Sequence, residues 1–322
     1  MDTAAPSRIQ DVASRIIDQV EKVIVGKRSV IEQVVIAILC EGHVLLEDVP
    51  GIGKTMLARS VASSLGGDFG RVQFTPDLLP SDITGSLVFD PRSAEFSYRQ
   101  GPIVTNILLA DEINRAGPRT QSALLEAMEE RQISVERERV VLPRPFFVLA
   151  TQNPVELEGT FPLPEAQLDR FLLRTTIGYP ELEHERNMLR RFRNDTPLSS
   201  VKAVTTPEEI LELIGLVKQV HIGVAVEDYL LDLVRRTRAH EGIEVGASPR
   251  ASLALSRATQ ARAALHGRAF ATPDDVREMA PSVLAHRIMP TSQSDLLGNS
   301  NEGLIETVIG ETPVPVEEVR AV

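Results

Sequence analysis

A glycine-rich stretch near the start of the chain has the residue types that bind phosphate groups. Its letters PGIGKTM place in a row Pro50, Gly51, Ile52, Gly53, Lys54, Thr55 and Met56. Glycines let backbone N–H groups turn toward phosphate oxygens, a lysine neutralises phosphate charge, and a threonine hydroxyl binds Mg²⁺. An apolar run at 44–46 precedes the stretch and a helical pattern at 56–65 follows it. We therefore predict a nucleotide site here rather than an ordinary turn between a strand and a helix.

One position of this stretch departs from the usual phosphate-binding pattern. The pattern G-x-x-x-x-G-K-[ST] begins with glycine, whereas this chain has Asp48 at that position. A carboxylate directed at the phosphates would weaken nucleotide binding by repulsion, and one directed away from them would have little effect. The sequence leaves both alternatives open.

A second apolar run, at residues 107–110, ends in the carboxylates Asp111 and Glu112. Nucleoside triphosphatases hold Mg²⁺ with an acid at the tip of a buried strand, and the next acid can polarise the attacking water. We therefore predict that Asp111 holds the metal together with Thr55 and that Glu112 is the catalytic base. A strand end without a catalytic role is the alternative, and the glycine-rich stretch makes the catalytic interpretation more specific.

A third apolar run, at residues 146–150, is followed by Asn153. An amide at such a strand tip can form a hydrogen bond with the attacking water or with the γ-phosphate. A plain Asn-Pro turn after a strand explains the same letters equally well.

The alternation of short aliphatic runs with helical patterns up to about residue 180 predicts an α/β fold with a parallel sheet. The strand candidates are residues 44–46, 71–74, 106–110, 146–150 and 171–177. In an open sheet of this class, ligands bind beyond the carboxyl ends of the strands. We therefore expect the polar groups that follow three of these strands to converge on one site.

Residues 181–290 show helical patterns alone and are expected to form a second, smaller domain. Thr206-Pro207 and Thr272-Pro273 each combine an N-cap threonine with a proline at the first helical position, so they predict two helix starts. Residues 242–248 are expected to be a loop. Residues 291–322 are polar with scattered valine and proline, and we expect a flexible tail there.

Length and composition limit the class of protein. The chain has 322 residues, 43% hydrophobic and 25% charged, which is typical of a folded protein with about two domains. The net charge of -11 repels phosphate backbones, so nucleic acid is not expected as a partner. The apolar run at 34–40 is too short to span a membrane and no signal-peptide core is present, so a cytoplasmic protein without membrane insertion is expected. The single cysteine and the spacing of the six histidines predict neither an internal disulfide nor a zinc site.

Four segments resemble, in order, the MoxR family of AAA+ ATPases. They are QFTPDLLPSDITG (73–85), ILLADEINRAGPRTQSALLEAMEERQ (107–132), PFFVLATQNPVELEGTFPLPEAQLDRF (145–171) and GASPRASLAL (246–255). The similarity extends over residues 20–290. It implies an AAA+ core at 1–180 and a smaller all-helical lid at 181–290. It also implies that ATP and Mg²⁺ bind at a Walker A motif formed by residues 50–55, with Asp111 and Glu112 as Walker B acids and Asn153 as sensor 1.

The resemblance implies roles for residues that spacing alone does not identify. Arg170 looks like the arginine finger that reaches the γ-phosphate held by a neighbouring subunit. Arg250 looks like sensor 2, which would extend from the lid to the phosphates of its own subunit. Val25 and Gly26 are expected to line the adenine pocket by the same resemblance. Without the other motifs, each arginine would be a solvated or ion-paired surface residue.

Two further segments fit the insertions of this family. Residues 75–101 resemble an insertion that such ATPases direct toward the pore of a ring, and their apolar residues, among them Val88 and Phe89, exceed what a solvent loop needs. Residues 133–145 alternate in polarity and predict a hairpin with Glu136, Arg137, Glu138 and Arg139 near its tip. Packing of either segment on its own domain is an equally good interpretation.

Three functions follow from these patterns. The resemblance implies an ATP-hydrolysing homo-oligomeric ring, expected to be a hexamer, that remodels or matures protein clients. The resemblance also implies that the protein helps to insert a metal or cofactor into its clients. It further implies a partner protein with a von Willebrand factor A domain. A nucleotide-gated scaffold with little turnover is the first alternative, favoured by Asp48 and opposed by Glu112. A DNA-remodelling motor is the second, opposed by the negative charge and by an aromatic content of 4%.

Overall fold

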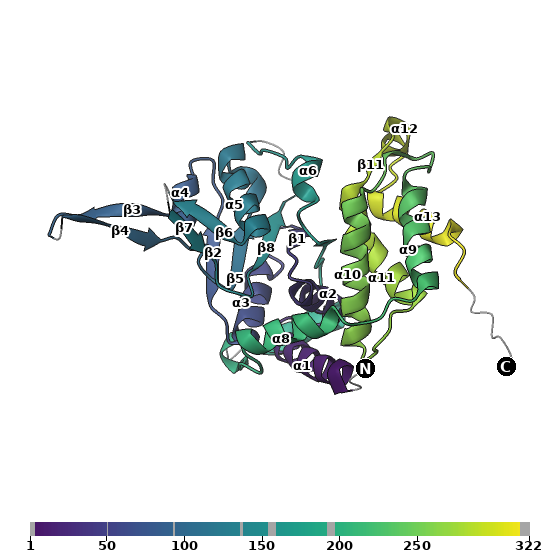
Figure 1. Ribbon diagram of the computed structural model, residues 1–322, viewed down its shortest axis with the longest axis horizontal. Helices are drawn as coiled ribbons and strands as arrows, with labels where there is room; N and C mark the ends of the chain where they lie inside the picture. The colour runs from purple at the N-terminus through teal and green to yellow at the C-terminus, as the bar shows by residue number, and fades with distance from the viewer. Residues whose placement is uncertain are drawn as a thin grey trace. The chain divides into compact units, whose positions relative to one another are not determined.

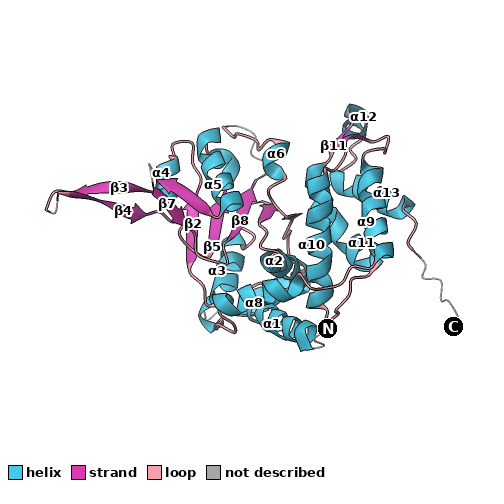
Figure 2. Ribbon diagram, in the orientation of Figure 1, coloured by secondary structure: helices cyan, strands magenta, loops and turns pink. Residues whose placement is uncertain are grey.

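The computed structural model describes residues 4–49, 51–92, 94–135, 138–153, 159–191 and 197–315 (Figures 1 and 2). These residues form two compact units. The α/β unit comprises residues 12–214, and the helical unit comprises residues 4–11 with 215–315. Among the residues that the structure describes, no helix is both long and apolar enough to cross a membrane.

The helical unit consists mainly of α-helices. Its elements are α9 (Val224–Thr237), β10 (Ile243–Val245), α10 (Pro249–Leu265), α11 (Pro273–Leu284), a 3-10 helix (Ala285–Arg287), β11 (Met289–Pro290), α12 (Ser292–Leu296) and α13 (Asn301–Glu311). Helix α11 begins at Pro273 with Thr272 as its N-cap in a capping box, so the predicted helix start is confirmed. Strand β10 lies inside the expected loop at 242–248, where it pairs with β11 and buries Ile243.

The expected flexible tail is wrong over much of its length. Helices α12 and α13 occupy its first part, and α13 packs against α11 and α9. The buried side chains of α13 are Leu304, Ile305, Val308 and Ile309. Their spacing forms one apolar stripe on a helix, which the surrounding polar residues obscure in the sequence. The tail beyond residue 315 lies outside the described residues.

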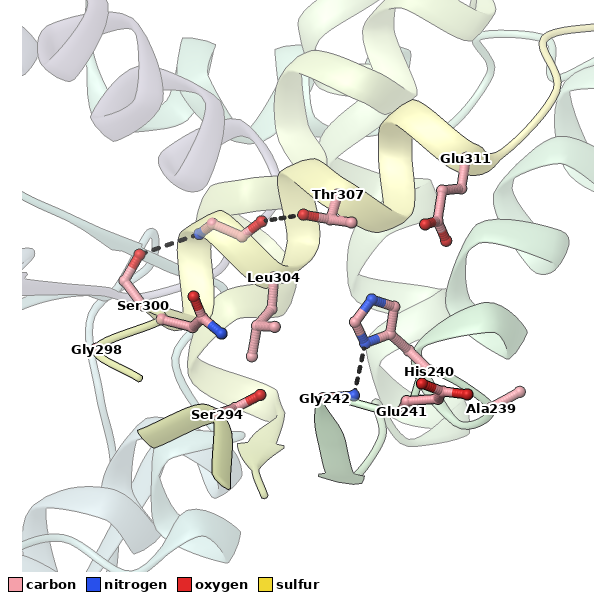
Figure 3. Close-up of a pocket in the computed structure, with 12 residues that line it drawn as sticks. Ala239, His240, Glu241, Gly242, Ser294, Gly298, Ser300, Leu304, Thr307 and Glu311 are labelled. Carbon is pink, nitrogen blue, oxygen red and sulfur yellow. Dashed lines mark hydrogen bonds between the residues drawn. The ribbon is translucent and has the colours of Figure 1, made fainter. Parts of the chain in front are cut away.

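The helical unit also contains a cavity of about 770 Å³ beside α13 (Figure 3). Polar side chains line it, among them His240, Glu241, Ser294, Thr307 and Glu311. The ring nitrogen Nδ1 of His240 accepts a hydrogen bond of 3.0 Å from the backbone N–H of Gly242. All lining residues come from 239–311, so none of the site residues predicted from the sequence belongs to this cavity.

A five-stranded parallel sheet forms the centre of the α/β unit. The strands are β1 (Val44–Glu47), β2 (Phe69–Gln73), β5 (Ile107–Asp111), β8 (Phe147–Gln152) and β9 (Leu173–Thr175), in the order β2-β5-β8-β1-β9. All neighbouring pairs are parallel. The five strand candidates are therefore confirmed, although the last is shorter than expected. Since β1, β5 and β8 are adjacent, the polar groups that follow them lie at one edge of the sheet.

Helices and two hairpins accompany this sheet, and two of the helices, α1 and α8, extend across the boundary between the units. The helices are α1 (Ala4–Glu21), α2 (Arg28–Leu39), α3 (Lys54–Leu65), α4 (Pro80–Thr84), α5 (Pro118–Glu130), α6 (Glu165–Leu168), α7 (Leu182–Arg191) and α8 (Pro207–Val217), with 3-10 turns at Ile113–Arg115 and Pro197–Ser200. Helix α8 begins at Pro207, and the N–H of Glu209 donates to the hydroxyl of Thr206 at 3.3 Å. This second predicted helix start is therefore also confirmed.

The two insertions form antiparallel hairpins. Strands β3 (Gly85–Asp90) and β4 (Glu95–Gln100) make a hairpin that extends away from the sheet (Figure 1). Phe89 and Phe96 pack against each other across it, with ring centroids 5.2 Å apart, and both remain exposed. Strands β6 (Gln132–Val135) and β7 (Glu138–Val141) form the hairpin predicted at 133–145. Of the four expected tip residues, Glu136 and Arg137 lie outside the described residues, and Glu138 and Arg139 begin β7.

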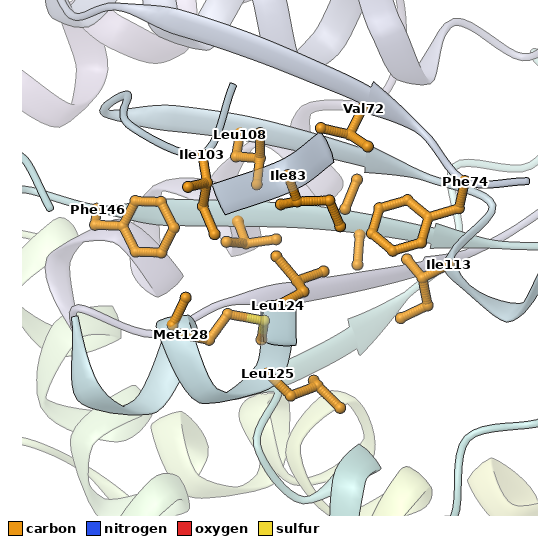
Figure 4. Packing of buried hydrophobic residues seen from close by; sticks show 14 of the residues in the cluster. Val72, Phe74, Ile83, Ile103, Leu108, Ile113, Leu124, Leu125, Met128 and Phe146 are labelled. Carbon is orange, nitrogen blue, oxygen red and sulfur yellow. The ribbon is translucent and has the colours of Figure 1, made fainter. Parts of the chain in front are cut away.

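A dense apolar core fixes the strands on one face of the sheet (Figure 4). Leu108 of β5 and Val148 of β8 are fully buried there against Leu124 and Met128 of α5. The alternate residues of β5, such as Leu109, point to the opposite face and are equally buried. Burial on both faces explains the continuous aliphatic letters of these strands and leaves only their tips for polar chemistry.

The boundary between the units lies near residue 214 rather than at the expected residue 180. The chain before α8 is attached to the α/β unit, because the N–H of Val204 donates to the carbonyl of Ser64 at 2.9 Å and Arg15 donates to the carbonyl of Val204 at 2.9 Å. Ile210 and Leu213 of α8 face apolar residues of α1, α2 and α3. The change from strands to helices in the sequence therefore does not coincide with the change of unit.

The buried carboxylate of Asp275 generates a prediction about the stability of the helical unit. It accepts hydrogen bonds from Arg262 at 2.5 Å and from two nitrogens of Arg268 at 2.6 Å each. Asp275→Asn should lower the free energy of unfolding by about 3 kcal/mol, because the arginines lose their buried counter-charge. The exposed neighbour Asp274 provides the matched control Asp274→Asn, and thermal unfolding followed by circular dichroism measures both variants. Equal melting temperatures for wild type and Asp275→Asn would contradict the assignment.

The same carboxylate predicts a pH dependence. Burial raises the pKa of Asp275, but hydrogen bonds from Arg268, Thr272 and Arg262 outweigh it and hold the pKa at about 2, below the ordinary 3.8. The ionised group therefore stabilises the fold above pH 3.8, and this contribution disappears as the pH falls toward 2. The stability difference between wild type and Asp275→Asn should shrink over that interval.

Candidate nucleotide-binding site

The glycine-rich loop connects β1 to α3 and is shaped by two left-handed residues. Gly51 has φ 87° and Gly53 has φ 95°, conformations that residues with a side chain rarely adopt. A Cβ atom on Gly51 would meet no atom within 4 Å, so the backbone of the loop faces open space. Gly53 is the N-cap of α3, and Thr55 and Met56 lie half-buried in the first turn of that helix. Pro50 lies outside the described residues.

Lys54 is the first residue of α3 and its side chain is almost entirely buried, at 8% exposure. Its Nζ donates a hydrogen bond of 2.7 Å to the backbone carbonyl of Asp48. Burial lowers the pKa of Lys54, while the charges of Asp111, Asp48 and Glu112 act in the opposite direction. The structure thus brings the predicted lysine close to both acids of the predicted metal and water site.

The carboxylate of Asp48 is turned toward the chain that follows β9. Its Oδ2 accepts hydrogen bonds from the backbone N–H groups of Ile177 at 2.5 Å and Gly178 at 2.8 Å. The other oxygen, Oδ1, accepts the N–H of Val49 at 3.2 Å. Of the two alternatives left open by the sequence, this geometry favours a carboxylate directed away from the glycine-rich loop.

Thr151 of β8 connects the two acids that follow β5. Its hydroxyl donates to Oδ1 of Asp111 at 2.7 Å and accepts the backbone N–H of Glu112 at 2.8 Å. Glu112 itself has φ 59°, an uncommon conformation for a residue with a side chain. Such local strain occurs preferentially at functional sites, and the bridge through Thr151 holds this backbone in place.

Besides Thr151, three further polar residues at this edge were not identified from the sequence. Arg71 donates to Oδ2 of Asp111 at 2.8 Å, and Gln73 donates to Oε2 of Glu112 at 2.8 Å. Arg115 also donates to Oε2 of Glu112, at 3.0 Å. Arg71 and Gln73 are two positions apart on β2, so both lie on the same face of the strand. The sequence Arg-Val-Gln in a predicted strand therefore could have indicated this polar pair.

The remaining residues predicted near the nucleotide lie in the same unit. Asn153 follows β8 directly and is buried, at 4% exposure. Val25 and Gly26 lie in the connection between α1 and α2, and the preceding Ile24 approaches the loop, since its Cδ1 is 3.7 Å from a Cβ placed on Gly53. The connection and the glycine-rich loop are therefore neighbours in space.

The two predicted arginines occupy different places. Arg170 follows α6 and forms an ion pair of 3.3 Å with Glu129 of α5, with about a third of its side chain exposed. Arg250 lies in the first turn of α10 in the helical unit and is exposed. Neither position by itself reveals a contact with phosphate.

The residues at this edge of the sheet have the chemistry that a nucleoside triphosphate with a divalent cation requires. The backbone of Gly51 faces open space, and the N-terminus of α3 and Lys54 supply positive potential. The oxygens of Thr55 and Asp111 are ligands that suit Mg²⁺. The fold and the site together define a P-loop ATPase of the AAA+ class.

Comparisons with known proteins agree with this class. The family model described as "ATPase family associated with various cellular activities (AAA)" matches residues 43–173, and a model of the AAA lid domain matches residues 235–307. The crystal structure of a candidate ATPase from Cytophaga hutchinsonii superposes with a TM-score of 0.91 at 37% identity and covers 97% of this chain and 98% of that one.

Relatives in three bacteria narrow the family. The Bacillus subtilis protein YeaC is 45% identical over 96% of this chain and 97% of its own length. Chaperone MoxR1 of Mycobacterium tuberculosis is 41% identical over 96% of this chain and 83% of its own length. Protein MoxR of Paracoccus denitrificans is 35% identical over 83% of this chain and 85% of its own length. The chain belongs to the MoxR family of AAA+ ATPases.

The bridge through Thr151 generates a prediction about catalysis. Thr151→Val keeps the shape of the side chain, but it removes the hydroxyl donor from Oδ1 of Asp111 and the acceptor from the N–H of Glu112, while Arg71 still donates to Oδ2 of Asp111. Each group should lose about 2 kcal/mol of hydrogen-bond stabilisation. Because the two acids are then held less firmly, the rate of ATP turnover should fall at least tenfold. Thr151→Ser retains the hydroxyl and is the matched control. Phosphate release measures the rate, and a normal rate in the valine variant would show that the bridge has no catalytic consequence.

Proposed function

We propose that this protein hydrolyses ATP at the shared interface of a ring of identical subunits and uses the resulting motion to remodel a protein client. The observation that carries the hydrolytic part is the restraint of Glu112. This residue has a left-handed backbone, and its side chain and N–H are held by Gln73, Arg115 and Thr151. A strained acid with three partners is expected for a water-activating group and is unnecessary in a passive scaffold.

In this proposal, the backbone N–H groups of residues 51–55 and the ammonium of Lys54 hold the phosphates, and Pro50 shapes the loop without donating a hydrogen bond. Thr55 and Asp111 hold Mg²⁺, which supplies charge neutralisation of the phosphate oxygens when it is bound. Because Asp111 pairs with Arg71 at 2.8 Å, Arg71 must release the oxygen that the cation takes.

Glu112 would orient the attacking water and take its proton, and Asn153 would donate its amide to the water or the γ-phosphate. Val25 and Gly26 would lie against the adenine.

The position of Arg170 supports the proposed ring. Its guanidinium is partly exposed and pairs with Glu129 on the surface of its own α5. An exchange of that partner for the phosphate of a neighbouring subunit would complete the site from outside, as an arginine finger does. Arg250 would act as sensor 2 from the helical unit and couple nucleotide state to the angle between the units. A hexamer is the expected assembly.

The client surface that we propose is the β3–β4 hairpin. Val88 is 43% exposed, Phe89 50% and Phe96 69%, and a group of exposed apolar side chains on one element is typical of a protein interaction site. One relative is named a chaperone, which supports a protein client. A partner with a von Willebrand factor A domain and the insertion of a metal or cofactor into a client complex remain parts of the proposal that rest on family resemblance.

Glu112→Gln should bind ATP with near-normal affinity and hydrolyse it at least a hundredfold more slowly, because an amide cannot accept the proton of the attacking water. The variant should therefore accumulate as ATP-bound rings that retain a client. Phosphate release, fluorescent-nucleotide titration and capture of the trapped complex measure these properties, and Glu130→Gln, on the exposed end of α5, is the control. A normal rate would disprove the role of Glu112, and a wild type that never turns over would favour the scaffold alternative.

A mixture of two inactive variants tests the shared interface. Lys54→Ala subunits lack phosphate binding but retain Arg170, whereas Arg170→Ala subunits retain the loop but lack the arginine. Mixed rings should recover part of the ATPase rate, because some interfaces combine both intact halves. Each variant alone is the control, and Arg170→Lys should recover little because it lacks the planar guanidinium. Mixtures without any recovered activity would contradict catalysis between subunits.

A further inference from the structure

Asp48 holds together two parts of the chain that are far apart in sequence. It follows β1, its own N–H donates to the carbonyl of Gln152 at 3.1 Å, and its side chain is buried at 8% exposure. Its carboxylate accepts the N–H groups of Ile177 and Gly178, 129 and 130 positions further along the chain. Hydrogen bonds from backbone amides to a buried carboxylate are stronger than those between neutral groups, so this connection resists displacement.

The segment that Asp48 holds continues along the predicted adenine pocket. The carbonyl of Tyr179 accepts a hydrogen bond of 2.8 Å from Nζ of Lys27. The ring of His184 lies against Gly26, because a Cβ atom on that glycine would be only 2.2 Å from Nδ1 of His184. Residues 177–184, named here the 177–184 segment, therefore face the connection that contains Val25 and Gly26.

Asp48 also contacts the phosphate side of the site through its backbone. Its carbonyl accepts the hydrogen bond from Nζ of Lys54, while its carboxylate is committed to the 177–184 segment. A glycine at this position would preserve the carbonyl and remove the carboxylate. Burial lowers the pKa of Lys54 and the charge of the carboxylate opposes that shift, but the hydrogen bonds of the side chain go to the N–H of Val49 and to the segment beside the predicted base pocket.

We infer that Asp48 is a positioning residue for the nucleotide base and determines the preference for adenine. By fixing the amides of Ile177 and Gly178, it holds the 177–184 segment at the correct distance from Val25 and Gly26, so that a purine of one shape fits between them. This inference rests on the proposed function, since it assumes that the nucleotide occupies this edge of the sheet.

The test compares Asp48→Gly, which restores the glycine of the phosphate-binding pattern, with Asp48→Asn and wild type. Titrations of the full chain with fluorescent ATP and GTP analogues, and competition by inorganic tripolyphosphate, measure the base and phosphate contributions separately. Asp48→Gly should lose about tenfold in preference for ATP over GTP, with tripolyphosphate affinity changed by less than about threefold. Asp48→Asn retains one oxygen acceptor for the two amides and should lose less.

Hydrogen exchange without nucleotide gives an independent measurement. The amides of Ile177 and Gly178 should exchange at least tenfold faster in Asp48→Gly than in wild type, because their acceptor is gone. Asp18→Asn, which neutralises an exposed acid of α1, is the control for a simple change of charge. If Asp48→Gly does not fold, the ratio of ATP to GTP affinity is measured in Asp48→Asn instead, where a smaller loss of preference is expected.

Three results would overturn the inference. Equal gains in affinity for ATP, GTP and tripolyphosphate would show that Asp48 acts by repelling phosphate. Equal losses for all three, or unchanged exchange of the two amides, would show that it does not position the base pocket. A wild type that binds none of these ligands would instead refute the proposed function, so the two failures are distinguishable.

Discussion

The balance of charge around Lys54 is the constraint on which the nucleotide site depends. One buried ammonium lies within the influence of three carboxylates, those of Asp111, Asp48 and Glu112. Partly buried acids that repel one another destabilise a fold unless each has its own partners. The structure provides them separately, with backbone amides for Asp48, Thr151 and Arg71 for Asp111, and Gln73 and Arg115 for Glu112. Each carboxylate of the site is thus paired within the chain itself.

This arrangement requires a sheet whose tips cannot move independently. Ala110 of β5 is in register with Ala150 of β8, and Leu46 of β1 is in register with Thr151. The hydroxyl of Thr151 therefore reaches the end of β5 from a neighbouring strand whose position is fixed by the core on the sheet. A shift of one residue in β8 would direct Thr151 to the opposite face and separate the acids from their bridge. The packing of the apolar core therefore determines the positions of Thr151, Asp111 and Glu112 relative to one another.

The sequence allowed prediction of those features that depend on local letters. The strands, the glycine-rich loop, the acid pair and the helix starts at Pro207 and Pro273 each follow from propensity or from a short motif. Features that depend on partners distant in sequence were beyond its reach. The amides that Asp48 holds lie 129 residues or more away, and the attachment of Val204 to α3 moves the boundary between the units. Helix α13 was missed for a different reason, since its apolar stripe is short and is surrounded by polar letters.

The departure of Asp48 from the phosphate-binding pattern then has a structural explanation. Glycine at the first position of such a loop permits close approach of the backbone, and here the same backbone carbonyl still reaches Lys54. The carboxylate is directed out of the loop. It accepts two amide hydrogen bonds, which glycine could not do because it has no side chain. The left-handed Gly178, with φ 64°, directs the chain from that contact toward Tyr179 and the connection after α1. One residue therefore contacts both the loop that faces phosphates and the segment that faces Gly26, so a displacement of either would be transmitted to the other through a single buried side chain.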